Sequence, residues 1–291
     1  MSSPVEGFLA HRPRLFGLAY RMLGSRSDAD DVLQDAWLRW QSAPKEELRS
    51  PEAWLVTVVT RLSIDRLRDA KKEREAYTGP WLPEPLVEEE ASETPERAVE
   101  LASDVSMAFL MVLERLAPDE RAVFLLREVF DMDYPEVAKM LGKSEAACRQ
   151  MLHRAKERVR QERPRFQVNP AAHRRLLDRF IAATGSGERE DMLALFAKDV
   201  RFSGDGGGKV PSALRVLEGA ERVARFYTAI RRFALGHSFT YQHAEINGEP
   251  GLLRFLDGKL DAAITLVTDG VSILEIYTVR NPDKLQHIHV S

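Results

Sequence analysis

The spacing of hydrophobic residues divides the chain into two helical blocks and a third block of mixed pattern. In the first block, residues 7–77, apolar residues recur every three or four positions, which is typical of helices that pack together. Gly24 is predicted to end the first helix, Ser27 to cap the second and Pro51 to begin the third. The second block, residues 105–159, repeats this helical pattern.

The third block follows a connector from Pro164 to Pro170 and combines helices with strands. Helices are expected at residues 171–183, 189–197 and 220–233, and strands at 260–268 and 271–279. Asp269 and Gly270 stand between the two strands, and both residue types tolerate a positive φ, which favours a hairpin turn. The third block is therefore predicted to be an α+β domain.

A connector of unusual composition follows the first block. Residues 79–85 read GPWLPEP, and its three prolines prevent a helix and favour a stiff, extended chain. Trp81 and Leu82 are large and apolar, so we expect them to dock on another part of the molecule. The alternative, a solvated linker with two exposed hydrophobic residues, remains open on sequence grounds.

The amino-acid composition excludes several classes of protein. The chain has 291 residues, 44% of them hydrophobic, which is enough for two or three packed domains. It contains no apolar run of the ~18 residues that a membrane span needs, and its first residues lack the hydrophobic core of a signal peptide. Its single cysteine, Cys148, excludes an internal disulfide and a multi-cysteine zinc site. We therefore expect a cytoplasmic protein without a membrane span, and we predict no cofactor and no metal.

The formal net charge of −3 conceals strong local charges. Residues 143–166 contain eight basic and three acidic side chains, a net charge of +5. Residues 61–74 contain six basic and three acidic side chains, a net charge of +3. Between them, residues 84–104 contain eight acidic side chains and one basic one, a net charge of −7. Two basic helices are thus separated by an acidic linker.

The most specific local pattern, residues 134–159, predicts a helix-turn-helix. A short helix begins at Pro135, Gly142 makes the turn, and Ser144 caps a longer helix. The buried stripe of the longer helix is expected to be Cys148, Leu152, Ala155 and Val159. Its outward side chains are then Arg149, Gln150, His153, Arg154 and Lys156. A basic stripe alone is more typical of a solvated face, but the turn, the cap and the one-sided charge together favour binding in a DNA major groove.

Two sets of short stretches, one in each helical block, point to a known family. The second block contains residues 112–116 (VLERL), 121–128 (RAVFLLRE) and 152–156 (LHRAK), and the first block contains residues 30–37 (DDVLQDAW), 53–55 (AWL) and 64–68 (IDRLR). These sets resemble region 4 (called σ4) and region 2 (called σ2), respectively, of the extracytoplasmic-function family of sigma factors. Residues 81–85 (WLPEP), 205–209 (DGGGK) and 281–285 (NPDKL) resemble the marks of one subgroup, which carries a C-terminal SnoaL-like domain.

The resemblance implies a multidomain fold with two all-α domains and a C-terminal α+β cone of the NTF2-like type. The implied boundaries are σ2 at 1–78, an acidic proline-containing linker at 79–104, σ4 at 105–165 and the SnoaL-like domain at 170–291. It also implies a specificity factor for RNA polymerase core rather than an enzyme, with σ2 melting and reading the −10 element of a promoter and σ4 reading its −35 element.

Site residues follow from the matched positions. For the −35 element the candidates are Arg149, Gln150, His153, Arg154, Lys156 and Lys143, and we expect Lys143, Arg158 and Arg160 to lie on phosphates. For the −10 element they are Arg61, Asp65, Arg66, Arg68, Lys71 and Lys72. Asp65 is equally explained by an ion pair with Arg68 on its own helix. The polymerase-binding candidates, toward the β′ clamp helices, are Asp31, Gln34, Asp35 and Leu38, and the β flap is a second expected partner. Compensation of the helix dipole explains the acidic residues at the start of that segment equally well.

The glycine-rich stretch 205–209 lacks the spacing of a phosphate-binding loop, so it does not predict a nucleotide site. Consecutive glycines permit positive φ and close backbone approach, which suits a contact surface. Our hypothesis is that this loop holds the linker, sets the spacing of σ2 and σ4, and regulates the protein in cis. The candidate interdomain residues are Trp81, Asp205, Gly206, Gly207, Gly208, Lys209, Asn281 and Asp283.

Other functions are weighed against this one. SnoaL-like relatives include cyclases with Asp/His pairs, for which the candidates here are Asp205, His237, His243, Asp257 and Asp269. No short motif places two of them on one substrate atom, and alternation of His287 and His289 is weak support for a metal site. A small-molecule ligand of the cone is left open, as is a regulator that binds duplex DNA without polymerase.

Overall fold

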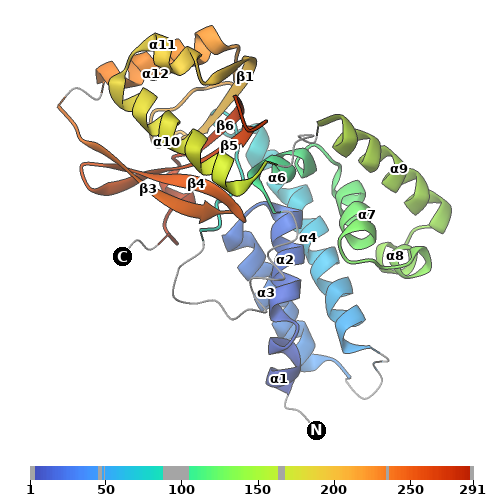
Figure 1. The fold of residues 1–291 in the computed structure, drawn as a ribbon. Helices are drawn as coiled ribbons and strands as arrows, with labels where there is room; N and C mark the ends of the chain where they lie inside the picture. Colours follow the sequence, from blue (N-terminus) through green and yellow to red (C-terminus); the bar gives the residue numbers. More distant parts are fainter. Residues whose placement is uncertain are drawn as a thin grey trace. The chain divides into compact units, whose positions relative to one another are not determined.

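The structure is a computed structural model that describes residues 4–44, 48, 50–87, 105–162, 168–233 and 236–288. The chain forms two compact units (Figure 1). The first unit comprises Met1–Glu75, Ser92–Val105 and Phe109–Arg163, and the second comprises Ala76–Ala91, Ser106–Ala108 and Pro164–Ser291. The acidic stretch predicted at 84–104 lies outside the described residues from residue 88 onward.

The first helical block consists of α1 (Pro4–Leu9), α2 (Arg12–Leu23), α3 (Arg26–Ser42) and α4 (Pro51–Glu75). Helices α2, α3 and α4 pack against one another (Figure 1). Gly24 ends α2 with a φ of 66°, as predicted. The predicted cap of α3 is wrong, because Ser25 rather than Ser27 caps the helix and its hydroxyl accepts a hydrogen bond from the amide of Asp28 at 3.2 Å.

The second helical block consists of α6 (Met107–Leu113), α7 (Pro118–Glu128), α8 (Tyr134–Leu141) and α9 (Glu145–Glu162). The predicted helix-turn-helix is confirmed in α8 and α9. Asp133 begins α8 with a reciprocal capping box to Glu136, and Gly142 ends it with a φ of 63°. The hydroxyl of Ser144 accepts a hydrogen bond from the amide of Ala147 and so caps α9, as expected.

The C-terminal part is an α+β domain, as predicted. Its helices are α10 (Pro170–Ser186), α11 (Arg189–Leu193), α12 (Ala220–Phe233) and the short 3₁₀ helix η2 (Pro282–Lys284). Its strands are β1 (Phe196–Asp205), β2 (Leu217–Glu218), β3 (Phe239–Ile246), β4 (Glu249–Leu256), β5 (Lys259–Thr268) and β6 (Ile273–Val279). They form one mixed sheet in the order β2-β1-β6-β5-β4-β3, in which β1 and β6 are parallel.

The core of this domain lies between the sheet and the helices α10 and α12 (Figure 1). Phe180 of α10 and Phe202 of β1 meet the ring of Tyr227 of α12 edge to face, with centroids 5.4 and 5.8 Å apart. The helix predicted to reach residue 197 ends at Leu193, because the chain then pairs with β6: Leu195 accepts a backbone hydrogen bond from Ile273.

The hairpin predicted at Asp269 and Gly270 is confirmed between β5 and β6. Gly270 has a φ of 93°, and the Asp269 carboxylate accepts hydrogen bonds from the amides of Val271 and Ser272. These bonds to the carboxylate lower the pKa of Asp269. The second strand starts at Ile273 rather than at Val271, because Val271 is part of the turn and is exposed.

Candidate functional site

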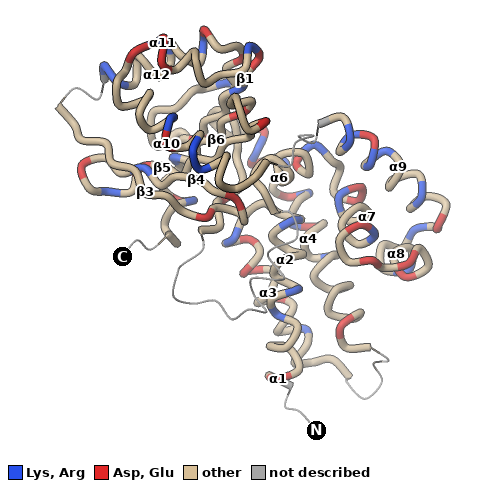
Figure 2. Tube along the Cα trace, viewed as in Figure 1, with Lys and Arg blue, Asp and Glu red and all other residues tan. Residues whose placement is uncertain are grey.

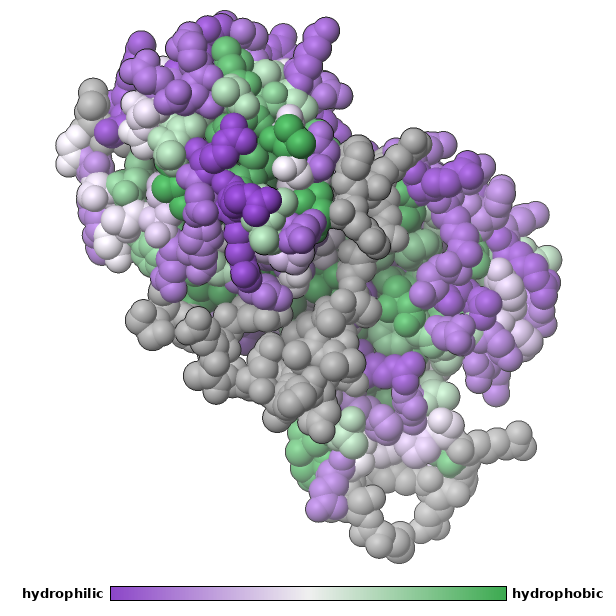
Figure 3. Space-filling model, in the orientation of Figure 1, coloured by the Kyte–Doolittle hydropathy of each residue, from purple (hydrophilic) through white to green (hydrophobic). Residues whose placement is uncertain are grey.

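Helix α9 presents a basic outer surface over an apolar stripe. Cys148, Leu152, Ala155 and Val159 are buried, as their spacing predicted. The candidate DNA-binding side chains on α9, all exposed, are Arg149, Gln150, His153, Arg154 and Lys156. Lys and Arg positions follow one another along this helix (Figure 2), and the side chains around it are mostly hydrophilic (Figure 3). The arrangement offers long hydrogen-bond donors to a polyanion.

Arg149 is held at the start of this surface by two neighbours. Its guanidinium lies 4.8 Å from the ring centroid of Tyr134, the first residue of α8. The same ring also lies under Arg127 of α7, at 4.5 Å. On its own helix, Arg149 donates to Glu145 at 2.7 Å. These contacts restrict a long side chain before any ligand arrives.

Glu120, in the first turn of α7, was not singled out by the sequence. Its side chain is only 8% exposed, and each of its carboxylate oxygens contacts one arginine of α9. Arg154 donates from Nε to Oε1 at 2.8 Å, and Arg158 donates from Nη1 to Oε2 at 3.1 Å. Arg158 was expected on a phosphate, and in this structure it binds α7 instead.

Helix α4 meets the helix-turn-helix at a groove of about 280 Å³ that Arg61, Asp65, Arg68, Asp119 and Lys143 help to line. The Nε of Arg61 donates to the carbonyl of Met140 at 2.8 Å. Asp119 accepts from Arg68 at 3.2 Å and pairs with Lys143 at 2.9 Å. Asp65 pairs with Arg68 at 3.3 Å, which is the ion pair within one helix that was the alternative explanation of Asp65.

The remaining candidates of α4 lie in different surroundings. Arg66 donates from Nε and Nη2 to Asp28 of α3, at 2.9 and 2.7 Å. Lys71 is exposed, whereas the side chain of Lys72 lies outside the described residues. Lys71 is therefore left on the surface, whereas the partly exposed Arg66 is bound to another helix of the first unit.

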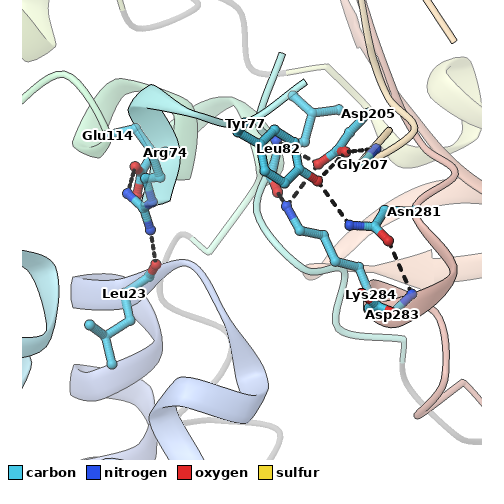
Figure 4. Close-up of polar contacts among 10 residues, drawn as sticks. All are labelled: Leu23, Arg74, Tyr77, Leu82, Glu114, Asp205, Gly207, Asn281, Asp283 and Lys284. Carbon is cyan, nitrogen blue, oxygen red and sulfur yellow. Dashed lines mark hydrogen bonds and ion pairs between the residues drawn. The ribbon is translucent and has the colours of Figure 1, made fainter. Parts of the chain in front are cut away.

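Two arginines join the two helical blocks in the interior of the first unit. Arg74 of α4 binds Glu114 and donates to the carbonyl of Leu23 at 2.8 Å (Figure 4). Arg121 of α7, which is 2% exposed, donates to Glu114 at 2.7 Å and to the carbonyl of Met22. Burial lowers the pKa of Arg74, and the carboxylate of Glu114 opposes that shift. Arg74 belongs to the basic stretch 61–74, and its side chain is committed to this contact within the first unit.

The segment expected to bind a protein partner lies on the outer surface of α3. Asp31, Gln34, Asp35 and Leu38 are exposed. Gln34 also lines an apolar groove of about 410 Å³ between α1 and α3, together with Val5, Phe8, Leu9 and Trp37. Asp30, at the edge of this groove, pairs with Arg12 at 3.0 Å. A largely apolar hollow with acidic neighbours can accommodate an amphipathic basic helix.

The connector and the C-terminal domain meet at Asp205, the last residue of β1, whose side chain is 0% exposed (Figure 4). One carboxylate oxygen accepts from the Tyr77 hydroxyl at 2.5 Å and from the Gly207 amide at 3.0 Å. The other accepts from the Leu82 amide at 2.9 Å and from Lys284 Nζ at 2.7 Å. We call this arrangement, Tyr77, Leu82, Asp205 and Lys284, the linker anchor.

Asn281, at the start of η2, extends the linker anchor by donating from Nδ2 to the Tyr77 hydroxyl at 2.9 Å. The ammonium of Lys284 also lies 4.1 Å from the ring centroid of Trp81. Burial, and secondly the bond to Asp205, raise the pKa of the Tyr77 phenol. Tyr77 and Lys284 were not among the predicted residues, although Lys284 belongs to the NPDKL stretch at residues 281–285.

The glycines after Asp205 are required by close packing. Gly207 and Gly208 have φ values of 60° and 70°. A Cβ at Gly207 would lie 2.4 Å from Asn281 Nδ2, and one at Gly206 would lie 2.3 Å from a backbone oxygen of Val210. Lys209, at the end of the loop, pairs with Asp283. The loop thus lies against η2 and the connector, as its glycines suggested.

The connector continues along the same domain after Leu82, which is fully buried. Leu86 and Asn247 exchange hydrogen bonds, since the Asn247 amide donates to the Leu86 carbonyl at 2.7 Å and the Leu86 amide donates to Asn247 Oδ1. Val87 forms an isolated bridge with Ile246. His287 lies 2.7 Å from the Pro85 carbonyl and 3.0 Å from Glu84. The prediction that this segment docks is confirmed.

A buried ion network supports the sheet beneath the linker anchor. Arg254 of β4 and Arg280 after β6 both bind Asp261 of β5 at 2.5 Å. Burial alone would raise the pKa of Asp261, but the two arginines hold it below its usual value. The Arg280 amide donates a hydrogen bond to the Asp205 carbonyl, and this backbone bond connects the ion network to the linker anchor.

Of the candidate acid–base residues, the structure brings together only His237 and Asp257, and it places Asp205, His243 and Asp269 elsewhere. His237 and Asp257 pair at 2.6 Å on the surface, and His243 pairs with Asp178 at 2.9 Å. Asp205 belongs to the linker anchor and Asp269 to the hairpin turn. Among the described residues, no three His, Cys, Asp or Glu side chains form a group that could hold a metal ion. His289 lies outside the described residues.

A search of the described helices finds none that is both long and apolar enough to cross a bilayer.

Comparisons with known proteins agree with this arrangement. A model described as Sigma-70 region 2 matches residues 8–73, and one described as Sigma-70, region 4 matches residues 106–159. The chain is 41% identical to the ECF RNA polymerase sigma factor SigJ of Mycobacterium tuberculosis, over 96% of this chain and 92% of that protein. It is 32% identical to the probable ECF RNA polymerase sigma factor SigI of the same organism, over 95% of this chain and 92% of that protein.

One solved structure is similar to this chain along nearly the whole length of both proteins. The crystal structure of the M. tuberculosis extracytoplasmic function sigma factor SigJ matches with a TM-score of 0.77 and 37% identity. The match covers 97% of this chain and 98% of that chain. It therefore spans both helical blocks and the C-terminal α+β domain.

Proposed function

Because this chain belongs to the extracytoplasmic-function (ECF) family of RNA polymerase sigma factors, we propose that its two helical blocks read separate promoter elements and that its C-terminal domain controls the linker between them. The family implies RNA polymerase core and promoter DNA as partners. In this proposal the chain supplies specificity to the polymerase and catalyses no step itself.

Helix α9 of σ4 reads the −35 element as a duplex. Arg149, Gln150, His153 and Arg154 are exposed on the helix that follows the turn, which is the helix that enters a major groove in this motif. Guanidinium groups recognise guanine with two hydrogen bonds, and each such contact contributes ~1–3 kcal/mol of discrimination. Lys143, Lys156 and Arg160 neutralise phosphates and fix the helix on the duplex.

Helix α4 of σ2 reads the −10 element as a separated strand. Arg61, Arg68 and Lys71 supply positive charge along one helix, and Asp65 is exposed among them. A carboxylate there accepts from a cytosine amino group once its pairing with Arg68 is exchanged. Arg66 is bound to Asp28, so we assign it to the packing of α4 on α3.

The promoter geometry requires σ2 and σ4 to separate. In the proposal, the −35 and −10 elements lie at different places along the duplex, so the two reading helices contact DNA apart from each other. In the first unit, however, Arg61 of σ2 bonds to Met140 of σ4, and Arg68 and Lys143 share Asp119. We therefore assign this arrangement to a closed state in which cations of both readers are occupied.

The β′ clamp helices of the polymerase are the proposed partner of α3. Gln34 lies in the apolar groove, and Asp31, Asp35 and Leu38 continue the exposed surface beside it. The β flap is the proposed partner of σ4. Opening the closed state would let these two surfaces engage polymerase at separate places.

The C-terminal domain regulates this opening in cis through the linker anchor. The observation that carries this part of the proposal is the fully buried Asp205 carboxylate, which holds the linker by the Tyr77 hydroxyl and the Leu82 amide. Eleven residues, from Tyr77 to Val87, lie along the domain. Their release would lengthen the free tether between σ2 and σ4 by up to roughly 36 Å, at about 3.3 Å per residue.

Run-off transcription with polymerase core tests the proposal, on a promoter selected from a random library by the wild-type holoenzyme. Asp205→Asn, and the milder Tyr77→Phe, should raise transcription severalfold because the tether lengthens. Asp257→Asn is the matched control, since its carboxylate lies in the surface pair with His237. If both anchor variants retain the wild-type unfolding temperature and transcribe at the wild-type level, the regulatory part of the proposal is wrong.

A further inference from the structure

Glu120 occupies a position that the sigma-factor assignment does not explain. It is an acidic side chain, 8% exposed, beneath a helix whose surface must attract a polyanion. A carboxylate at this position reduces the positive charge that attracts phosphates. We therefore expect Glu120 to have another role that offsets this loss of DNA affinity. We propose that Glu120 is a positioning residue that orients Arg154 for reading a −35 base. This inference rests on the proposed function, in which Arg154 contacts base edges.

The surroundings of Glu120 make a buried carboxylate stable. It lies in the first turn of α7, where the helix dipole favours a negative charge. Each oxygen accepts a charge-assisted hydrogen bond from a different arginine of α9. Arg158 also donates to the Arg115 carbonyl at 3.3 Å. The carboxylate is therefore held at both oxygens and cannot turn toward a single partner.

The contact fixes Arg154 by one edge and leaves the other edge outside the pair. Arg154 binds Glu120 through Nε, so Nη1 and Nη2 are not part of this hydrogen bond. Two donors on one edge of a guanidinium are what bidentate recognition of guanine uses. Holding Nε restricts the torsions of a long side chain in advance, which lowers the entropy lost when the base is bound. The side chain remains 52% exposed.

Replacing Glu120 with glutamine should change two measurable quantities in opposite directions, namely the non-specific affinity for DNA and the discrimination between bases at one −35 position. Glu120→Gln removes a negative charge near DNA, so non-specific affinity of the holoenzyme should rise by about two- to fivefold. The neutral amide holds Nε less firmly, so discrimination at the base read by Arg154 should fall, by about threefold to tenfold. If Glu120 only stabilised the fold, its replacement would lower both the non-specific affinity and the discrimination. If Glu120 acted only through its charge, its replacement would leave the discrimination unchanged.

The experiment uses full-length chain, polymerase core and a promoter library randomised across the −35 element. Bound DNA is sequenced to give the preference at each position for the wild type, Arg154→Ala, Glu120→Gln and Glu120→Asp. Asp131→Asn is the charge-matched control, because it removes one negative charge from the turn before α8 at a φ of 51°, which suits asparagine. Glu120→Asp keeps the charge but shortens the reach, and provides a second test if Glu120→Gln is less stable.

Arg154→Ala identifies the position that Arg154 reads. We expect Glu120→Gln and Glu120→Asp to flatten the preference at that position alone, while Asp131→Asn leaves it intact. If Arg154→Ala changes no position, the assignment of Arg154 in the proposed function fails. If Arg154→Ala flattens a position that neither Glu120 variant alters, the positioning role of Glu120 is overturned and the assignment of Arg154 stands.

Discussion

Arg61 of α4 donates a hydrogen bond of 2.8 Å from Nε to the backbone carbonyl of Met140 in α8. A side chain proposed to follow the −10 strand is therefore bound to the helix-turn-helix proposed to read the −35 element. Asp119 joins the same two helical blocks by pairing with both Arg68 and Lys143. The cations that would contact DNA are the ones that hold the closed state, so closure and promoter binding compete for them.

Asp119→Asn should weaken the closed state. Loss of one partly exposed carboxylate leaves Arg68 and Lys143 as neighbouring cations, and costs about 0.5–1 kcal/mol of contact energy. The ratio of open to closed molecules should rise about two- to fivefold. Small-angle scattering of the full chain should show a larger maximum dimension, and added salt should produce the same change in the wild type. Equal scattering of Asp119→Asn and the control Asp131→Asn would contradict this.

Arg149→Ala and Arg160→Ala should have different effects on DNA binding, the first on sequence preference and the second on affinity for every sequence. Arg149 is assigned to a base, so its loss should cost ~1–3 kcal/mol on the selected promoter and relax preference at one −35 position. Arg160 is exposed in the last turn of α9 and is assigned to a phosphate. Its loss should weaken holoenzyme binding to all sequences alike and reduce the salt slope by about one. Titrations at several salt concentrations measure both, and identical profiles for the two variants would refute the division.

Gly207→Ala should destabilise the linker anchor more than Gly258→Ala. Both glycines have a positive φ, 60° and 78°, so both substitutions cost about 1–2 kcal/mol of backbone strain. Only at Gly207 would the new Cβ approach Asn281 Nδ2, at 2.4 Å, whereas nothing lies within 4 Å at Gly258. Displacing Asn281 loses its bond to Tyr77, which adds at least about 1 kcal/mol.

Urea unfolding compares these two glycine variants, and hydrogen exchange at the Leu82 amide reports on the anchor itself. We expect faster exchange at Leu82 in Gly207→Ala alone. Equal losses of stability and equal exchange in both variants would show that the contact between Gly207 and Asn281 is unimportant.

Features that depend on neighbouring residues could be predicted from the sequence, whereas contacts between residues far apart in the chain could not. Turn and cap residues predicted α8 and α9, and their spacing identified which side of α9 is buried, because both depend on neighbours within about four residues. Glu120 could not be found this way, since an acid in the first turn of a helix is fully explained by the dipole. Its partners lie 34 and 38 residues further along the chain.

The linker anchor shows the same limit. The glycines of 205–209 predicted a close contact surface, and Trp81 and Leu82 predicted a docking segment, so the two halves of the anchor were identified separately. Tyr77 was missed because its partner Asp205 is 128 residues away and no spacing rule joins them. Arg66 was placed on nucleic acid because it belongs to the IDRLR stretch that resembles region 2, and Arg74 belongs to the basic stretch 61–74, but contacts with Asp28 and Glu114 hold these two side chains in the folded chain.

Tyr77 should make stability depend on alkaline pH. Burial and the bond to Asp205 raise its pKa in the folded protein above the ordinary value of about 10. The contribution of Tyr77 is therefore complete below pH 10, where both states keep the proton, and is lost as the pH rises through the folded pKa, since the unfolded chain ionises first.

Urea unfolding of wild type and Tyr77→Phe at pH 8 and pH 10.5 measures this contribution. The difference in free energy of unfolding should shrink at the higher pH. Tyr227, whose pKa burial also raises, is common to both proteins and cancels in the difference. A difference that stays constant or grows would mean that the Tyr77 hydroxyl is not held as the structure shows.

Cys148 is the single cysteine of the chain, it is fully buried in α9, and burial raises the pKa of its thiol. Such a thiol reacts slowly with maleimide dyes. Fluorophores can therefore be attached at Ser42→Cys and Gln161→Cys, both at exposed positions, without first removing the native cysteine. Energy transfer between the two dyes would then follow, in single molecules, how far σ2 and σ4 move apart as polymerase and promoter are added.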